Sequence, residues 1–173
     1  MNKQSITQQL LGSFLALAII GALLTLPSAH ASRPGTASGS WTDCQTITDF
    51  RFVGPNLIIT WDVTITFTGT FTGTWVGTER DVIYPENSHL AATFYGSGVL
   101  TSSDNTGTVV MTYQGTAASP TQAVAYWVVD QGTGSLAGLH GQGTFQNIIE
   151  TGSTDECDDT FTADYSGQTQ VAP

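Results

Sequence analysis

Strict alternation between apolar and polar side chains over residues 58–68 constrains this chain more than any other feature. Trp61, Val63, Ile65 and Phe67 share one face, and threonine or aspartate fills the positions between them. Successive side chains of a strand point to opposite faces, so this segment is predicted to be a strand with one buried face. No window of about 11 residues keeps the apolar period of a helix, and we therefore expect no substantial helix.

Similar segments return at regular spacing along the chain. Their expected bounds are residues 47–52, 71–83, 90–100, 108–115, 123–129, 141–149 and 161–167. About eight short strands separated by Gly-, Pro- and Asn-containing turns predict an all-β barrel or sandwich. A closed antiparallel barrel is favoured because these strands carry almost no Lys to protect an open edge. Glycines inside the strands are expected at bulges or bends, namely Gly73, Gly77, Gly96, Gly98, Gly141 and Gly143.

The N-terminal pattern is typical of a secretory signal peptide. Lys3 precedes an apolar run at residues 10–26, and Ala29 and Ala31 then supply the small residues of a cleavage site. An uncleaved membrane anchor is the alternative, since the run is close to the lower limit of a bilayer span. Because the small residues follow the run directly, we expect cleavage after Ala31, secretion of the protein, and no stable membrane anchor.

The expected organisation is a signal peptide, a flexible leader, a β-barrel domain and a C-terminal tail, at residues 1–31, 32–45, 46–167 and 168–173. The leader is rich in Gly and Ser. Cys44 and Cys157 are the only cysteines, and a cysteine pair in an exported chain most often forms a disulfide. Two free thiols or an intermolecular bridge are the alternatives.

The chain is strongly acidic, with 14 Asp and Glu against four Lys and Arg and a formal net charge of −10. Binding nucleic acid requires several Lys or Arg to displace counterions from phosphate, so a nucleic-acid partner is excluded. Docking on anionic lipid is excluded for the same reason. The acidity favours cationic partners or substrates.

Several segments resemble a known family. They are VGTER at 76–80, GTVVM and YQGT within 107–116, GTGSLAGLHGQG at 132–143, and FTADY at 161–165. In this order they are similar to an uncharacterised bacterial family of domains of unknown function, grouped by fold with the allene oxide cyclase and dirigent barrels. The likeness extends over about residues 49–167, and the glycine-rich block is its most specific part.

This resemblance implies an eight-stranded antiparallel β-barrel with an interior cavity, in a family without an established activity. The chain departs from the family pattern by its signal peptide, its cysteine pair, and His140, where members carry arginine. No motif of the allene oxide cyclase site is present, so none of that enzyme's catalytic residues is carried over.

Glu79, Tyr113 and His140 are the candidate catalytic residues. Glu79 shares a strand face with Trp75, and if that face is the lumen, an apolar environment would raise the carboxyl pKa toward values useful for acid–base chemistry. A turn among glycines would bring His140 to the barrel mouth, as a general base paired with Glu79 or Asp130. The alternative is that these groups are ordinary surface or rim residues.

Aromatic side chains and Glu79 supply the candidate ligand-binding residues, which are Trp75, Glu79, Tyr113 and Trp127. Trp75 and Tyr113 align with the apolar faces of their strands, where they either line a pocket or form ordinary core. An eight-stranded barrel is either nearly filled by its side chains or holds one small ligand.

The remaining motifs predict no cofactor and no metal. The glycines at 132–138 follow a strand, but no helix comes after them, so they are interpreted as hairpin glycines with positive φ rather than a dinucleotide loop. Acidic residues at 155–159 form a solvated loop or a loose calcium site. His89 and His140 lack the spacing of zinc ligands.

Three functions fit these observations. The leading hypothesis is a secreted barrel that binds a small, partly apolar ligand in its lumen. An isomerase- or cyclase-like enzyme acting within the barrel is the first alternative, and it requires polar groups that converge. A non-catalytic extracellular surface or matrix protein is the second, and a solidly packed lumen would favour it.

Overall fold

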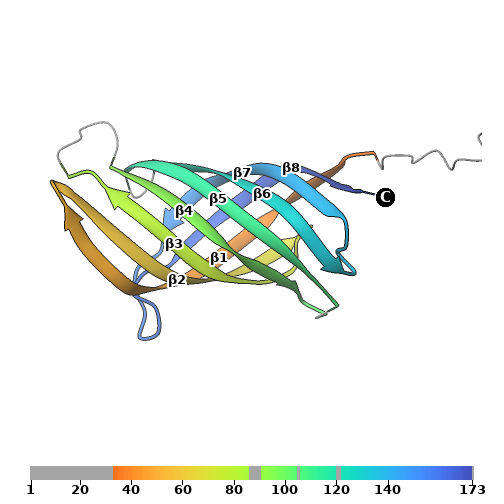
Figure 1. Cartoon of the computed structure of the whole chain (residues 1–173), viewed down its shortest axis with the longest axis horizontal. Helices are drawn as coiled ribbons and strands as arrows, with labels where there is room; N and C mark the ends of the chain where they lie inside the picture. The colour runs from red at the N-terminus through yellow and green to blue at the C-terminus, as the bar shows by residue number, and fades with distance from the viewer. Residues whose placement is uncertain (1–32, 86–90, 105, 120–121, 173) are drawn as a thin grey trace, which may run out of the picture. The chain divides into compact units, whose positions relative to one another are not determined.

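The computed structural model describes residues 33–85, 91–104, 106–119 and 122–172. Its strands are β1 (Gly35–Val53), β2 (Asn56–Gly69), β3 (Gly73–Ile83), β4 (Ala92–Ser102), β5 (Gly107–Ser119), β6 (Gln122–Gly134), β7 (Leu139–Glu150) and β8 (Phe161–Val171). Each strand pairs antiparallel with the next, and β1 pairs with β8 to close a barrel (Figure 1). The eight antiparallel strands confirm the expected architecture, while the predicted signal peptide and His89 lie outside the described residues.

The barrel uses more of the chain than predicted. β1 starts at Gly35 and pairs with β8 along its first half, so the flexible leader expected at 32–45 is wrong from Gly35 onward. The tail expected at 168–173 is wrong because β8 extends through most of it. Small residues at the start of β1 have a packing role: a Cβ on Gly39 would lie 2.7 Å from the Tyr165 ring. The start of β1 has the composition of a linker because its small residues leave room for the large Tyr165 side chain of the neighbouring strand β8.

Other in-strand glycines also make room for aromatic rings. A Cβ on Gly143 would lie 2.5 Å from the Trp127 ring, and one on Gly98 would lie 2.7 Å from the Trp75 ring. The expectation that such glycines mark bulges is wrong for Gly77, Gly96, Gly98, Gly141 and Gly143. Irregularities of the ladders lie instead between Ile47 and Asp49, Val110 and Met111, Ala117 and Ser119, and Gln146 and Ile149.

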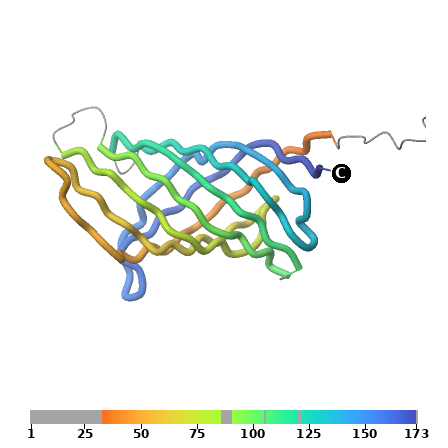
Figure 2. The backbone as a smooth tube through the Cα atoms, viewed as in Figure 1, coloured from red at the N-terminus to blue at the C-terminus, as the bar shows by residue number. Residues whose placement is uncertain are grey.

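The two ends of the barrel differ in packing. At the end where β3, β5 and β7 begin, the rings of Phe67, Phe71, Trp127 and Tyr165 contact one another inside the lumen. The Tyr165 hydroxyl accepts a hydrogen bond from the Phe71 N–H at 2.7 Å, which fixes this cluster. We call this the closed end, and the end where β3, β5 and β7 finish, at the left of Figure 2, the open end.

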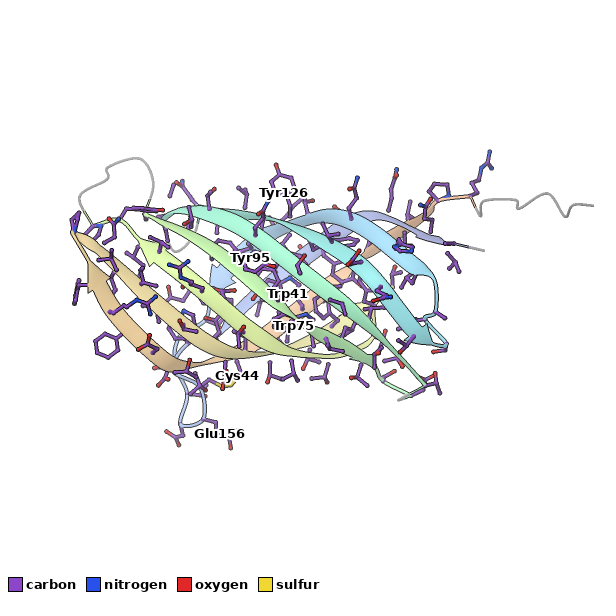
Figure 3. All side chains as sticks on the ribbon, viewed as in Figure 1. Trp41, Cys44, Trp75, Tyr95, Tyr126 and Glu156 are labelled. Carbon is purple, nitrogen blue, oxygen red and sulfur yellow. A yellow bond between two sulfur atoms is a disulfide. The ribbon has the colours of Figure 1, made fainter. Side chains whose placement is uncertain are left out.

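A disulfide joins Cys44 of β1 to Cys157 in the connection between β7 and β8, as predicted. The backbone strengthens this junction, because the Gln45 N–H donates to the Asp159 carbonyl at 2.9 Å. Figure 3 shows Cys44 at the base of this connection and Glu156 at its tip. The bridge therefore fixes the β7–β8 connection against the barrel wall.

Removing the disulfide should destabilise the barrel. The bridge joins residues 113 positions apart. Closing a loop of about 100 residues stabilises a fold by up to about 4.7 kcal/mol, because it restricts the unfolded chain. We expect a Cys44→Ser/Cys157→Ser variant to lose about 2–4 kcal/mol of unfolding free energy in urea denaturation. A free energy equal to that of the parent would contradict this.

The steric role of the in-strand glycines is tested at Gly143. We expect Gly143→Ala to lose about 1–3 kcal/mol of unfolding free energy, because the new methyl group would lie 2.0 Å from the Ser166 carbonyl oxygen and 2.5 Å from the Trp127 ring. Gly35→Ala is the matched control, since a Cβ there would meet its nearest atom at 3.8 Å. Equal losses in the two variants would show that backbone freedom, rather than space for the ring, is what Gly143 provides.

Candidate functional site

A cavity of about 280 Å³ lies at the open end, and every strand contributes to its wall. Its aromatic lining consists of Trp41, Trp61, Phe94, Tyr113, Phe145 and Phe161. Its carboxyl groups are Asp43, Glu79, Asp81, Glu150 and Asp159. A mostly apolar chamber with a few polar groups is the usual form of a small-molecule site.

Glu79 and Tyr113 meet across the strand that separates them. The ladders pair Glu79 with Gly96 and Gly96 with Tyr113, so these residues form one row across β3, β4 and β5. Gly96 leaves space for the phenol, because a Cβ there would lie 2.2 Å from Tyr113 Cζ. The Tyr113 hydroxyl donates a hydrogen bond to Glu79 Oε2. Glu79 is only 7% exposed and faces the lumen.

Burial raises the pKa values of Glu79 and of Asp81, two residues further along β3. It raises the pKa of Glu79 well above its usual range, and repulsion from Asp81 raises it further. Burial also raises the pKa of Asp81, against hydrogen bonds from Glu79 and from Trp61 Nε1, the latter at 2.9 Å. Burial and mutual repulsion therefore favour the protonated form of the Glu79 carboxyl, and burial favours that of Asp81.

Asp43 adds a second buried carboxyl from β1. Burial raises its pKa to about 7, although hydrogen bonds from Gln45 and from the Phe161 N–H act in the opposite direction. Gln45 Nε2 donates to Asp43 Oδ2 at 2.8 Å, and the Phe161 N–H donates to Oδ1. Repulsion from Asp159 also raises the Asp43 pKa. The wall at β1 and β8 thus carries an acid that titrates near neutrality.

Two polar atoms of the cavity wall lack a hydrogen-bond partner. They are Trp41 Nε1, on a side chain that is 7% exposed, and the buried Oδ1 of Asp81. Buried polar groups are normally paired, so each such group requires an explanation. Both atoms belong to side chains of the cavity wall but are themselves buried within it.

Two of the predicted ligand-binding residues support the site without lining it. Trp75 and Trp127 are 0% exposed, and both belong to the packed core rather than to the cavity wall. The Trp75 ring lies 5.5 Å from that of Tyr113, and its Nε1 donates to the Met111 carbonyl at 3.1 Å. Trp75 therefore holds the Tyr113 ring in position, while Glu79 and Tyr113 are the predicted residues that reach the cavity.

His140 does not take part in this site. It is the second residue of β7 and lies at the closed end, where it shares a surface hollow with Asp130. The prediction that His140 would pair with Glu79 is therefore wrong. His140 lies at the start of β7 rather than in a loop over the cavity, and this places it at the opposite end of the barrel from Glu79.

Asp43, Gln45 and Asp81 are site residues that the sequence reasoning missed. Asp81 has the same strand parity as Glu79, and this signal was sufficient to place it on the lumen face. Asp43 and Gln45 fall within the segment expected to be a leader. Because β1 extends to Gly35, both residues belong to a strand of the barrel, and both line the cavity.

Of the other sequence motifs, the acidic segment at 155–159 contributes Asp159 to the cavity wall, and the glycine-rich segment forms a turn. The glycine-rich segment is a hairpin, in which Gly134 and Gly138 have φ values of 59° and 72°. Within the described residues, no group of three or more His, Cys, Asp and Glu side chains is arranged to hold a metal ion. No helix in the described part of the chain is long and apolar enough to cross a membrane.

Comparison with known proteins identifies a family. Residues 54–157 match the family described as "Protein of unknown function (DUF3224)". A crystal structure of a DUF3224 protein of unknown function from Shewanella oneidensis MR-1 matches with a TM-score of 0.61 and 16% identity, over 82% of this chain and 99% of that one. No curated protein matches the chain.

A second solved structure extends the likeness beyond the family. The pterocarpan synthase dirigent protein GePTS1 matches with a TM-score of 0.52 and 13% identity, over 82% of this chain and 92% of its own. At these identities the likeness concerns the fold alone. The resemblance drawn from the sequence, an uncharacterised family with a dirigent-like fold, is confirmed.

The raised pKa of Asp43 predicts that stability decreases as the pH rises. The folded state keeps the Asp43 proton up to about pH 7, whereas the unfolded state loses it near 3.8, so unfolding free energy falls between these values. The slope is at most about 1.4 kcal/mol per pH unit for one group. We expect Asp43→Asn to reduce the loss of stability measured by urea denaturation between about pH 5 and pH 8.

Asp62→Asn is the control for this experiment, because Asp62 is exposed on the outer face of β2. Its pH dependence should match that of the parent. A slope in Asp43→Asn equal to those of the parent and the control would show that Asp43 does not titrate as its burial requires.

Proposed function

The chain belongs to the DUF3224 family of proteins of unknown function, and we propose that it binds a small, partly apolar ligand in the cavity at the open end of its barrel. The observation that carries this proposal is a chamber lined by six aromatic side chains and five carboxyl groups. Such a chamber offers apolar contact and a few polar groups to one ligand.

The size of the cavity limits the ligand. Its volume of about 280 Å³ is close to the lower end, about 300 Å³, of ordinary ligand sites. Aromatic side chains from six strands would supply most of the contact with the ligand, and the carboxyl groups would determine its orientation. A compound of one or two rings with at least one hydrogen-bonding group suits this chamber.

Export is the second part of the proposal. We propose that residues 1–31 direct secretion and are removed after Ala31. The Cys44–Cys157 disulfide is compatible with this, because such bridges persist in oxidising compartments. The ligand would then be an extracellular compound.

Filling the cavity tests the binding function. N-phenyl-1-naphthylamine, a neutral apolar fluorophore, should bind the parent protein saturably. We expect Ala123→Trp to weaken this binding by about tenfold or more, because Ala123 lines the cavity and the indole would occupy it. Val124→Trp is the matched control, since the next residue is 57% exposed on the outer face.

Two outcomes would count against a ligand cavity. One is the absence of saturable fluorescence with the folded parent. The other is an equal effect of Ala123→Trp and Val124→Trp. Circular dichroism establishes that each variant is folded before its affinity is compared.

An isomerase- or cyclase-like enzyme is a second candidate function. The observation that favours it is the hydrogen bond between Tyr113 and Glu79 at the cavity wall, where burial raises the pKa of Glu79 well above its usual range. Such an acid can protonate a bound compound, with Tyr113 orienting the carboxyl. Glu79→Gln tests the enzymatic role, because it should abolish any turnover while the neutral fluorophore still binds saturably. A surface or matrix role has less support, since the lumen is open at one end.

A further inference from the structure

We propose, on the basis of the binding function above, that the ligand of this cavity is a small organic cation, an amine or ammonium group on an apolar body. If the binding function fails, this inference fails with it, and the experiment below separates the two. The argument rests on the carboxyl groups and the aromatic side chains of the wall.

Among the described residues, the cavity wall collects carboxyl groups without a balancing base. They come from β1 (Asp43), β3 (Glu79 and Asp81), the end of β7 (Glu150) and the β7–β8 connection (Asp159), and none of the described lining residues is Lys, Arg or His. Tyr113 of β5 is the remaining titratable group among these lining residues. The arginines of the described chain, Arg33, Arg51 and Arg80, are all exposed.

Burial disfavours the ionised forms of the buried carboxyl groups Asp43, Glu79 and Asp81. Repulsion from Asp81 raises the Glu79 pKa, and repulsion from Asp159 raises that of Asp43, beyond the effect of burial. A positive charge among these groups would favour their ionised forms and release protons on binding. Asp81 is one of the carboxyl residues of the cavity wall, and an ammonium group there would form a charge-assisted interaction with them.

The aromatic wall suits the same ligand. A cation over the face of Trp, Tyr or Phe is attracted by the ring quadrupole, by about 2 kcal/mol when the site is desolvated. Trp41 and Trp61 lie in the wall with Asp43 and Asp81, so one cation can meet both rings and carboxylates. The indole N–H of Trp61 already donates to Asp81, which holds that carboxyl at the wall.

An organic cation fits the geometry better than a metal ion. In the described chain, the carboxyl groups do not converge in any group of three that is arranged around a metal ion. The cavity of about 280 Å³ exceeds the roughly 30 Å³ share of one water molecule severalfold, so a body of several heavy atoms is needed to fill it.

Three compounds of one size and different charge test the proposal. They are 2-phenylethylamine, 2-phenylethanol and phenylacetate, which are a cation, a neutral molecule and an anion. At about pH 8 we expect the amine to bind about tenfold more tightly than the alcohol, and phenylacetate most weakly, by isothermal titration calorimetry. The preference should shrink at about pH 5.5, where the carboxyl groups hold their protons. Titrations in two buffers of different ionisation enthalpy should report proton release.

Two variants locate the preference. Asp81→Asn keeps an oxygen for the Trp61 N–H and removes a charge, so it should reduce the amine affinity about tenfold and preserve that of the alcohol. Glu150 is exposed at the rim of the cavity, so Glu150→Gln removes a second negative charge without disturbing the hydrogen bonds of the buried carboxyl groups. Asp62→Asn on the outer face is the matched control and should change neither affinity.

The outcomes distinguish the two proposals. Equal or tighter binding of 2-phenylethanol or phenylacetate at about pH 8 would overturn the cation preference and leave the binding function standing. An amine preference that survives unchanged in both Asp81→Asn and Glu150→Gln would also overturn it. Failure of the amine to bind while N-phenyl-1-naphthylamine binds saturably would do the same. Failure of every compound, the fluorophore included, would overturn the binding function itself.

Discussion

Closure of the sheet through the pairing of β1 with β8 is the constraint on which the rest of the structure depends. A barrel leaves no free strand edge, so the backbone groups of both terminal strands are satisfied within the fold. Closure also creates the lumen, which receives every second side chain of each strand. The Gly- and Ser-rich start of β1 is therefore as necessary as the large apolar strands, because it completes the ring beside Tyr165.

Pairing of glycines with aromatic rings divides the lumen into two parts. At the closed end, Trp127 and Tyr165 lie over glycines of neighbouring strands and fill the space with Phe71. Towards the open end, Gly96 allows Tyr113 to lie across β4, but the rings there line a chamber instead of filling it. Pairing of glycines with aromatic rings thus contributes to a solid core at one end of the barrel and to a cavity at the other.

The buried acids give the cavity its chemical character. Desolvation of Asp43, Glu79 and Asp81 disfavours their ionised forms, and their proximity disfavours them further. Such a cluster opposes the stability of the empty barrel as the pH rises. Groups that reduce stability in this way tend to occur at functional sites, where a ligand compensates for them. Binding of a cation, as proposed, would explain why these buried acids lie together in the cavity wall.

Much of this protein follows from its sequence alone. Alternating side chains predicted most of the strands, and they placed Glu79 on the same face as Trp75 without deciding whether that face is the lumen. The two cysteines predicted the disulfide. Only the tertiary structure decided that Asp43 lines the cavity, that Tyr113 reaches Glu79 over Gly96, and that His140 lies at the far end. The period of a strand establishes which face a side chain occupies. Its height along the barrel depends on the register between strands, which backbone hydrogen bonds between distant residues establish.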